Sequence, residues 1–143
     1  IKEYHMDPEK VEIEITESVF LEDEFHLVEM IKRIRNNGIK VSLDDFGTGY
    51  SSLSYLKNIP VDTLKIDKTF VDSLGEMKTS DIITSSVIEM MQRLGMEIIA
   101  EGVETEVQYE FLRRMKCDNI QGFYLARPMN ADSIKAVIRE ERC

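Results

Sequence analysis

Polar side chains stand at or near the ends of five successive apolar segments of this sequence. They are Glu14, the pair Asp44 and Asp45, Lys65, Glu101 and Gln121. If the segments are parallel strands, their carboxyl ends meet at one edge of a sheet, where ligands bind in parallel α/β folds. One such residue would mean little, but a series in successive units indicates a shared site rather than separate structural roles.

The carboxylates Glu14, Asp44, Asp45 and Glu101 would supply hard oxygen ligands, which suit Mg²⁺ or Mn²⁺. Adjacent Asp44 and Asp45 can bridge and flank two cations, an arrangement that clamps the attacking and leaving oxygens of a phosphodiester. A zinc site is not expected, because neither histidine of the chain lies at a strand end.

Lys65 has two interpretations. It would orient or deprotonate a metal-bound water, or it would only neutralise the carboxylate cluster. Gln121 is a neutral hydrogen-bonding group, suited to positioning water or substrate.

Glycines flank Thr48 in the segment that follows Asp45. Gly47 and Gly49 would allow close backbone approach and hinge motion. A plain tight turn explains the same pair, so the glycines alone are weak support for a functional loop.

The elements that must position these residues alternate between strand and helix patterns. We expect strands at residues 11–16, 39–43, 63–67, 97–100 and 120–125, and helices at 22–37, 51–57, 80–94, after Thr105 and at 131–140. This alternation predicts a parallel sheet with right-handed crossovers. A complete (β/α) barrel needs roughly 250 residues, so we expect an incomplete TIM-type barrel of about five βα units, or else a small open sheet.

The hydrophobic pattern also predicts which faces are buried. In residues 11–16 the apolar side chains alternate with Glu12 and Glu14, so the glutamates would face a barrel interior. Apolar stripes predict three buried helix faces: Leu27, Val28, Ile31 and Ile34; Ile83, Val87, Met90 and Leu94; and Val107, Phe111, Leu112 and Met115. Thr105 and Gln108 form a capping box before the last of these.

The bulk composition excludes several classes of protein. The net charge of -9 argues against binding nucleic acid or an anionic membrane. No apolar run is long enough to span a bilayer. Cys117 and Cys143 have no zinc or disulfide spacing, which favours reduced thiols in the cytosol. The chain starts without Met and lacks a signal peptide, so residues 1–143 are interpreted as a fragment of one domain.

Taken together, the motifs resemble the EAL domain, the bacterial phosphodiesterase that opens cyclic di-GMP to linear pGpG. The resemblance extends from Val11 to about Ile138. Its motifs are Glu14-Ile15-Thr16-Glu17-Ser18, Asp44-Asp45-Phe46-Gly47-Thr48-Gly49-Tyr50-Ser51-Ser52-Leu53, Leu64-Lys65-Ile66-Asp67, Ala100-Glu101-Gly102-Val103-Glu104 and Gln121-Gly122-Phe123. Their order and spacing make the resemblance specific.

The resemblance implies a role for each matching residue. Glu14, Asp44, Asp45 and Glu101 match the metal ligands of a two-metal site, and Lys65, Glu101 and Asp45 match its catalytic groups. Gln121 matches the glutamine near the catalytic water, and Pro128 and Met129 resemble a segment near a guanine of the substrate. Glu17 matches the glutamate that braces the loop containing Thr48, and Asp67 and Glu104 match supporting positions behind the ligands.

The resemblance also implies what is missing and what accompanies the chain. The Glu-Ala-Leu signature and an asparagine ligand would precede Ile1. We therefore expect the complete domain to hydrolyse cyclic di-GMP with Mg²⁺ or Mn²⁺, and the fragment alone to be inactive or very weak. The alternative is a non-catalytic cyclic di-GMP receptor. The family implies a homodimer, fusion to sensor or GGDEF-type domains, and a place in the cytoplasm or in the cytoplasmic part of a membrane-anchored sensor.

Overall fold

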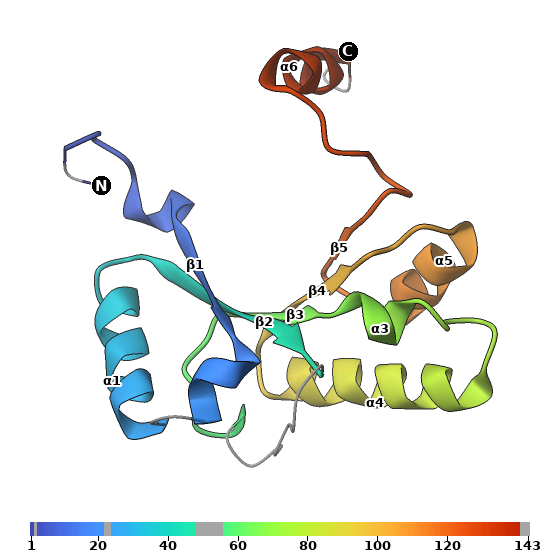
Figure 1. Ribbon diagram of the computed structural model, residues 1–143, viewed down its shortest axis with the longest axis horizontal. Coiled ribbons are helices and arrows are strands. Elements are labelled where there is room, and N and C mark those ends of the chain that lie inside the picture. The colour runs from blue at the N-terminus through green and yellow to red at the C-terminus, as the bar shows by residue number, and fades with distance from the viewer. Residues whose placement is uncertain (2, 22–23, 48–55, 141–143) are drawn as a thin grey trace.

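The computed structural model describes residues 1, 3–21, 24–47 and 56–140, and a five-stranded parallel sheet runs through it (Figure 1). The strands are β1 (Glu12–Thr16), β2 (Lys40–Phe46), β3 (Thr63–Ile66), β4 (Glu97–Glu101) and β5 (Asn119–Gln121). Their order in the sheet is β1-β2-β3-β4-β5. Strands that follow one another in sequence order are typical of a (β/α) barrel, whereas a doubly wound sheet reverses its order at a switch point. The predicted barrel-type α/β fold is confirmed.

Helices lie in the connections between β1 and β2, β3 and β4, and β4 and β5, as crossovers between parallel strands require. The described helices are α1 (Glu24–Arg35), α3 (Lys68–Val71), α4 (Lys78–Arg93), α5 (Glu106–Arg114) and α6 (Ala131–Glu140), with 3₁₀ helices η1 (Pro8–Lys10) and η2 (Glu17–Leu21). The sequence did not predict α3 or the 3₁₀ helices. The predicted helix at 51–57 lies mostly outside the described residues. None of the described helices combines the length and the apolar character that crossing a membrane requires.

The core lies between the sheet and the helices α1 and α4 (Figure 1). Leu43, Leu64 and Ile98, on three neighbouring strands, are fully buried. In β1, Ile15 is buried and Glu14 is exposed, as the alternation predicted. Helices α1 and α4 therefore cover one face of the sheet, and the acidic side chains project from the other.

Helix α4 packs on a face one residue away from the predicted stripe. Ile83 is 49% exposed, whereas Thr84, Ile88 and Met91 are buried. The predicted stripe failed because apolar residues stand at both registers of this helix, and the packed register includes a threonine. Thr84 can be buried there because its hydroxyl donates a hydrogen bond to the carbonyl oxygen of Phe70 at 3.2 Å.

At the start of helix α5, the buried residue is again not the predicted one. Val107 is 57% exposed, although the stripe predicted its burial, and Gln108 is buried. The capping box is confirmed: Thr105 accepts a hydrogen bond from the backbone N–H of Gln108, and the Gln108 side chain accepts one from that of Thr105. A buried glutamine is tolerated because it satisfies backbone donors at the helix start.

Two strands end three or more residues from their predicted ends, while β3 and β4 end within one residue of theirs. Strand β2 continues through Asp44 and Asp45 to Phe46, with an irregular register between Leu43 and Phe46. Strand β5 is shorter than residues 120–125 and ends at Gln121. The chain turns there, because the N–H of Leu125 bonds back to the carbonyl oxygen of Gly122.

Candidate active site

Lys65 lies at the centre of an acidic cluster on the sheet face away from the helices. Its Nζ is 2.9 Å from Oε1 of Glu14, 3.3 Å from Oδ1 of Asp44 and 2.8 Å from Oε1 of Glu101. These residues come from β1, β2, β3 and β4, toward the carboxyl ends of the strands. The structure thus brings together four of the residues that the sequence placed at a shared edge. We name Lys65, Glu14, Asp44 and Glu101 the Lys65 cluster.

The charge of Lys65 is fixed by this surrounding. Burial by itself lowers the pKa of Lys65, but hydrogen bonds to Glu101 and Glu14, and the negative charge of Asp44, raise it above its usual value. The side chain is therefore an ammonium group at neutral pH. As arranged here, it donates hydrogen bonds and neutralises charge; it has no lone pair with which to deprotonate a water.

Asp45 lies beside the cluster in the irregular stretch of β2. It is exposed and has a φ of 56°, in the left-handed region that few non-glycine residues adopt. Its N–H bonds to Oδ1 of Asp44 at 3.0 Å. An extra residue in one strand bends that strand and redirects its side chains, which is why neighbouring aspartates here differ in exposure.

Glu17 holds the backbone just beyond these aspartates. Its side chain is 6% exposed, and Oε2 accepts a hydrogen bond from the N–H of Gly47 at 3.1 Å. This contact lies at the one end of the loop that is described, and the bracing role that the resemblance implied stays a prediction. Thr48 lies outside the described residues.

The segments after β4 and β5 are joined through their backbones. The N–H of Val103 bonds to the carbonyl oxygen of Gln121 at 3.1 Å, and the N–H of Tyr124 bonds to that of Val103 at 2.9 Å. A Cβ added to Gly122 would lie 2.1 Å from the Val103 oxygen, so only glycine permits this approach. Gln121 is paired in register with Glu101 and is thereby placed next to the cluster.

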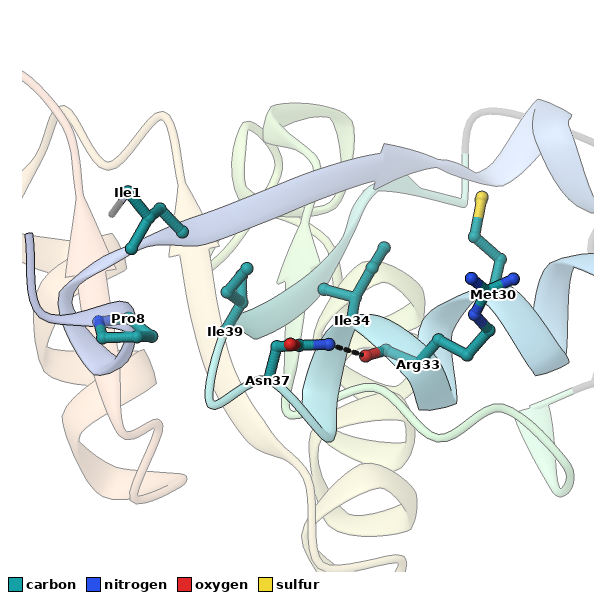
Figure 2. Close-up of a pocket in the computed structure, with 7 residues that line it drawn as sticks. All are labelled: Ile1, Pro8, Met30, Arg33, Ile34, Asn37 and Ile39. Atoms are coloured by element: carbon teal, nitrogen blue, oxygen red, sulfur yellow. Dashed lines mark hydrogen bonds between the residues drawn. The ribbon is translucent and has the colours of Figure 1, made fainter. Parts of the chain in front are cut away.

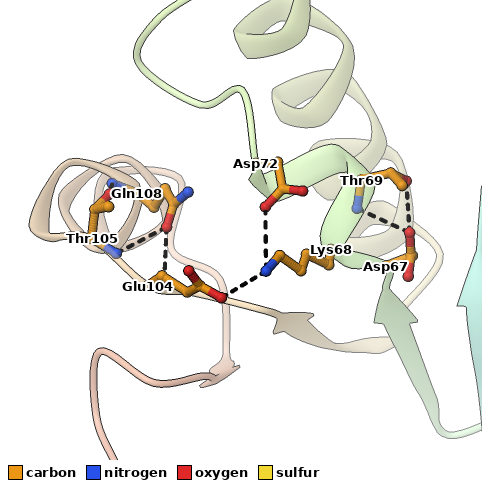
Figure 3. Close-up of polar contacts among 7 residues, drawn as sticks. All are labelled: Asp67, Lys68, Thr69, Asp72, Glu104, Thr105 and Gln108. Carbon is orange, nitrogen blue, oxygen red and sulfur yellow. Dashed lines mark hydrogen bonds and ion pairs between the residues drawn. The ribbon is translucent and has the colours of Figure 1, made fainter.

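A second polar network lies between α3 and the segment that leads to α5 (Figure 3). Lys68 Nζ donates to Oε1 of Glu104 at 2.6 Å. Asp67 caps α3 by accepting from the N–H and the hydroxyl of Thr69, at 2.9 and 2.7 Å. Burial by itself would raise the pKa of Asp67, but these hydrogen bonds outweigh it and lower the pKa. The supporting positions Asp67 and Glu104 are thus placed by contacts of their own.

Pro128 and Met129 lie exposed in the connection between β5 and α6. The contacts of the described residues do not join either of them to the Lys65 cluster. The nearer part of this connection is ordered by aromatic contacts: the Tyr109 and Tyr124 rings stack with centroids 5.2 Å apart, and the Arg127 guanidinium lies 4.4 Å from the Phe123 ring centroid.

The donor chemistry of the cluster fits Mg²⁺ or Mn²⁺, because three carboxylates converge on a single cationic atom. The cation they share is the Lys65 ammonium, and among the described residues no group of three or more His, Cys, Asp or Glu is arranged to hold a metal ion. Among the described residues, the buried Ser42 hydroxyl lacks a hydrogen-bond partner. Ser42 is paired in register with Glu14 on the neighbouring strand, so the two residues lie on the same face of the sheet. The site therefore has suitable ligands and an unsatisfied polar group, but its carboxylates surround the Lys65 ammonium rather than a position for a metal ion.

A cavity of about 530 Å³ lies elsewhere, near the beginnings of β1 and β2 (Figure 2). It is lined by Ile1, Pro8, Met30, Arg33, Ile34, Asn37 and Ile39. Its walls are mostly apolar and contain no carboxylate. The chemistry of the Lys65 cluster is therefore not shared by this cavity.

Sequence reasoning missed Lys68 and Ser42. Lys68 stands three residues after Lys65, and Glu104 stands three residues after Glu101, but these spacings alone mean little. Only the fold shows that Lys68 and Glu104 form a pair. Ser42 had one available signal, a polar residue between Val41 and Leu43 in a buried strand.

Known proteins resemble this chain along most of its length. The sequence profile of the EAL domain matches residues 1–128. The bifunctional diguanylate cyclase/cyclic di-GMP phosphodiesterase MucR of Pseudomonas aeruginosa is 40% identical over 135 residues, which are 94% of this chain and 20% of that protein. A structure of the MucR phosphodiesterase in complex with c-di-GMP matches with a TM-score of 0.86, over 93% of this chain and 54% of that chain.

Two further solved structures are similar. The EAL domain of Mycobacterium smegmatis DcpA matches with a TM-score of 0.90 and 40% identity, over 97% of this chain and 62% of that chain. Klebsiella pneumoniae BlrP1, solved as a manganese/cy-diGMP complex, matches with a TM-score of 0.79 and 34% identity, over 86% of this chain and 31% of that chain. The chain spans about a fifth of its first curated relatives' length and a little over half of the first solved chains.

Proposed function

The chain belongs to the EAL domain family, and from this premise we propose that the complete domain around it hydrolyses cyclic di-GMP to linear pGpG. The observation that carries the proposal is the convergence of Glu14, Asp44 and Glu101 on Lys65 at one edge of the sheet. Three acidic side chains would not be kept together on a partly desolvated face without a cation to share. MucR and BlrP1, each solved with the cyclic dinucleotide, support the choice of substrate.

Glu14, Asp44, Asp45 and Glu101 would hold the metal ions, Mg²⁺ or Mn²⁺. When bound, such ions activate a water and neutralise the charge of the phosphodiester. Further ligands would come from segments of the domain outside this chain, because the described carboxylates surround the Lys65 ammonium and form no group of three or more arranged to hold a metal ion. The 143 residues alone would then be inactive or very weak.

The other residues would orient the reactants. Lys65, as an ammonium group, donates hydrogen bonds to an attacking water or a phosphate oxygen, and it forms ion pairs with Asp44 and Glu101. Gln121, beside Glu101, offers a neutral amide to the same water or to the substrate. Pro128 and Met129 would contact a guanine, and Glu17 would hold the loop after Asp45 in place through Gly47. We place the domain in the cytoplasm as a homodimer, fused to sensor or GGDEF-type domains.

The test is hydrolysis by the full-length protein. Purified protein is incubated with Mn²⁺ and cyclic di-GMP, and the products are separated by chromatography. We expect linear pGpG, and we expect Glu101→Gln to reduce its rate by at least about 10²-fold because a group essential to the site is lost. The matched control is Glu89→Gln, which removes an exposed carboxylate paired with Arg93 on α4 and should leave the rate unchanged.

Two outcomes would contradict the proposal. No pGpG from wild-type protein that binds cyclic di-GMP would identify a non-catalytic receptor. Equal rates for Glu101→Gln and wild type would show that the chemistry takes place elsewhere in the protein. Sedimentation of the full-length protein as a monomer at all concentrations would refute the homodimer.

A further inference from the structure

Lys68 and Glu104 lie just after the ends of two neighbouring strands. Lys68 stands three residues after Lys65 of β3, and Glu104 stands three residues after Glu101 of β4. These strands are paired in register, Lys65 with Ile99 and Ile66 with Ala100. The ion pair between Lys68 and Glu104, 2.6 Å long, therefore links the two segments that leave the Lys65 cluster (Figure 3).

The stem of Lys68 makes a second contact with the same segment. Gly102, directly after Glu101, has a φ of 72°, and a Cβ there would lie 2.5–2.8 Å from the Cγ, Cβ and Cδ atoms of Lys68. The methylene groups thus lie flat against the Gly102 backbone, while the ammonium group reaches Glu104. One side chain covers the beginning of the segment 102–104 and anchors its end.

The two residues of the Lys68–Glu104 ion pair each belong to a backbone segment that is fixed by hydrogen bonds. Lys68 is the first residue of α3, whose N-cap is Asp67. The N–H groups of Glu104 and Thr105 both donate to Oε1 of Gln108, at 2.8 and 3.0 Å. An isolated exposed ion pair joins two loose side chains and contributes little, but this pair joins two fixed supports, so it can transmit position.

The segment that Lys68 covers is also tied to β5. Val103 is fully buried, and its N–H bonds to the carbonyl oxygen of Gln121. A displacement of residues 102–104 would therefore move both Glu101 and Gln121. In the site proposed above, these residues serve the metal and the water.

We propose that Lys68 is a positioning residue of the active site, which holds the Glu101 carboxylate in place by pairing with Glu104 and packing on Gly102. This rests on the proposed function. Lys68, which lies outside the Lys65 cluster, would thus fix the position of Glu101, a proposed metal ligand. Partners behind metal ligands matter because their loss typically costs about 10–100-fold in metal affinity or activity.

The test uses the full-length protein and the variant Lys68→Met, which keeps the stem and removes the charge. The kinetics of hydrolysis give kcat and KM. Mn²⁺ affinity is measured independently from the electron paramagnetic resonance signal of free Mn²⁺. We expect kcat to fall and Mn²⁺ affinity to weaken by about 10-fold or more, with KM changed much less. Lys68→Arg, which restores a cation, should recover most of both.

The matched control is Lys32→Met on α1. Lys32 pairs with Glu29 at 2.8 Å, and its side chain is 53% exposed, against 46% for Lys68. This variant removes the same charge from a similar exposed pair away from the cluster, and it should leave kcat and Mn²⁺ affinity unchanged. Glu104→Gln breaks the proposed bridge from its other end, so a folding failure of one variant leaves the other to decide.

The outcomes separate this inference from the proposed function. If wild type is active and Lys68→Met matches Lys32→Met in kcat and Mn²⁺ affinity, the inference is wrong and the function stands. If wild type produces no pGpG, the proposed function is wrong and the Mn²⁺ titration decides the inference alone. Weaker binding by Lys68→Met then supports it, and unchanged binding, or no binding by wild type, overturns it.

Discussion

Replacing Gly122 with alanine is expected to separate β5 from the segment that follows β4. The added Cβ would lie 2.1 Å from the carbonyl oxygen and 2.4 Å from the nitrogen of Val103. Both are backbone atoms, which cannot rotate away as a side chain could. The two segments must therefore part by on the order of 1 Å to restore an ordinary contact of about 3.5 Å.

The size of the effect follows from the contacts that such a movement breaks. Two backbone hydrogen bonds hold the approach, from Val103 to Gln121 and from Tyr124 to Val103. Each contributes about 0.5–1.5 kcal/mol, and forced overpacking costs about 1–3 kcal/mol. These losses total about 2–6 kcal/mol, and alanine returns about 0.4–1 kcal/mol by restricting the unfolded chain, so the free energy of unfolding should fall by about 1–5 kcal/mol. Because Gln121 moves with β5, hydrolysis should fall by about 10²-fold.

The assay combines denaturation of the full-length protein with hydrogen exchange of single amides. The amides of Val103 and Tyr124 should lose protection in Gly122→Ala. The control is Gly95→Ala after α4, where φ is 78° but an added Cβ would meet no atom within 4 Å. That variant has only the cost of left-handed backbone, about 1–2 kcal/mol, and should keep full activity. If Gly122→Ala were no less stable than Gly95→Ala and kept both amides protected, the close approach would be refuted.

Three further predictions concern the surroundings of the site. Thr105→Ala removes the cap of α5 and should lower the free energy of unfolding by about 1 kcal/mol in denaturant titration; a change near zero would show that the cap is dispensable. Glu17→Ala removes the buried acceptor of the Gly47 N–H and should speed exchange of that amide about 10-fold or more, whereas unchanged exchange would contradict the bracing contact. Burial raises the pKa of Cys117 from 9.0 to about 11, so peptide-resolved alkylation should be slow at pH 8 and accelerate toward pH 11. The protonated thiol correspondingly favours the folded state below pH 9, and this contribution is lost as the pH rises through about 11; an alkylation rate that levels off by pH 9 would refute the shift.

Local sequence signals correctly predicted features that depend only on neighbouring residues, such as helix starts and turns. Gly38, in the turn that follows α1, has a φ of 80°, as expected of a residue without a Cβ, and the Thr105 capping box starts α5. The same signals failed for the buried face of α4. Its apolar residues allow two registers, and the choice of Ile88 over Ile83 depends on what the sheet and α3 present to the helix.

The sequence by itself determined the family, the barrel-type alternation of strands and helices, and the residue types that gather at the carboxyl edge. These features depend on residues that are close together in the sequence: alternating or helical apolar patterns, with glycines and caps between them. They can therefore be recognised without the fold. Only the tertiary structure decided that Glu14, Asp44 and Glu101 share one ammonium group, and that Lys68 reaches Glu104. These contacts join strands far apart in the chain, and their distances depend on register, on the irregularity of β2 and on the approach of Gly122 to Val103. No local pattern encodes them, because they exist only once the strands lie side by side.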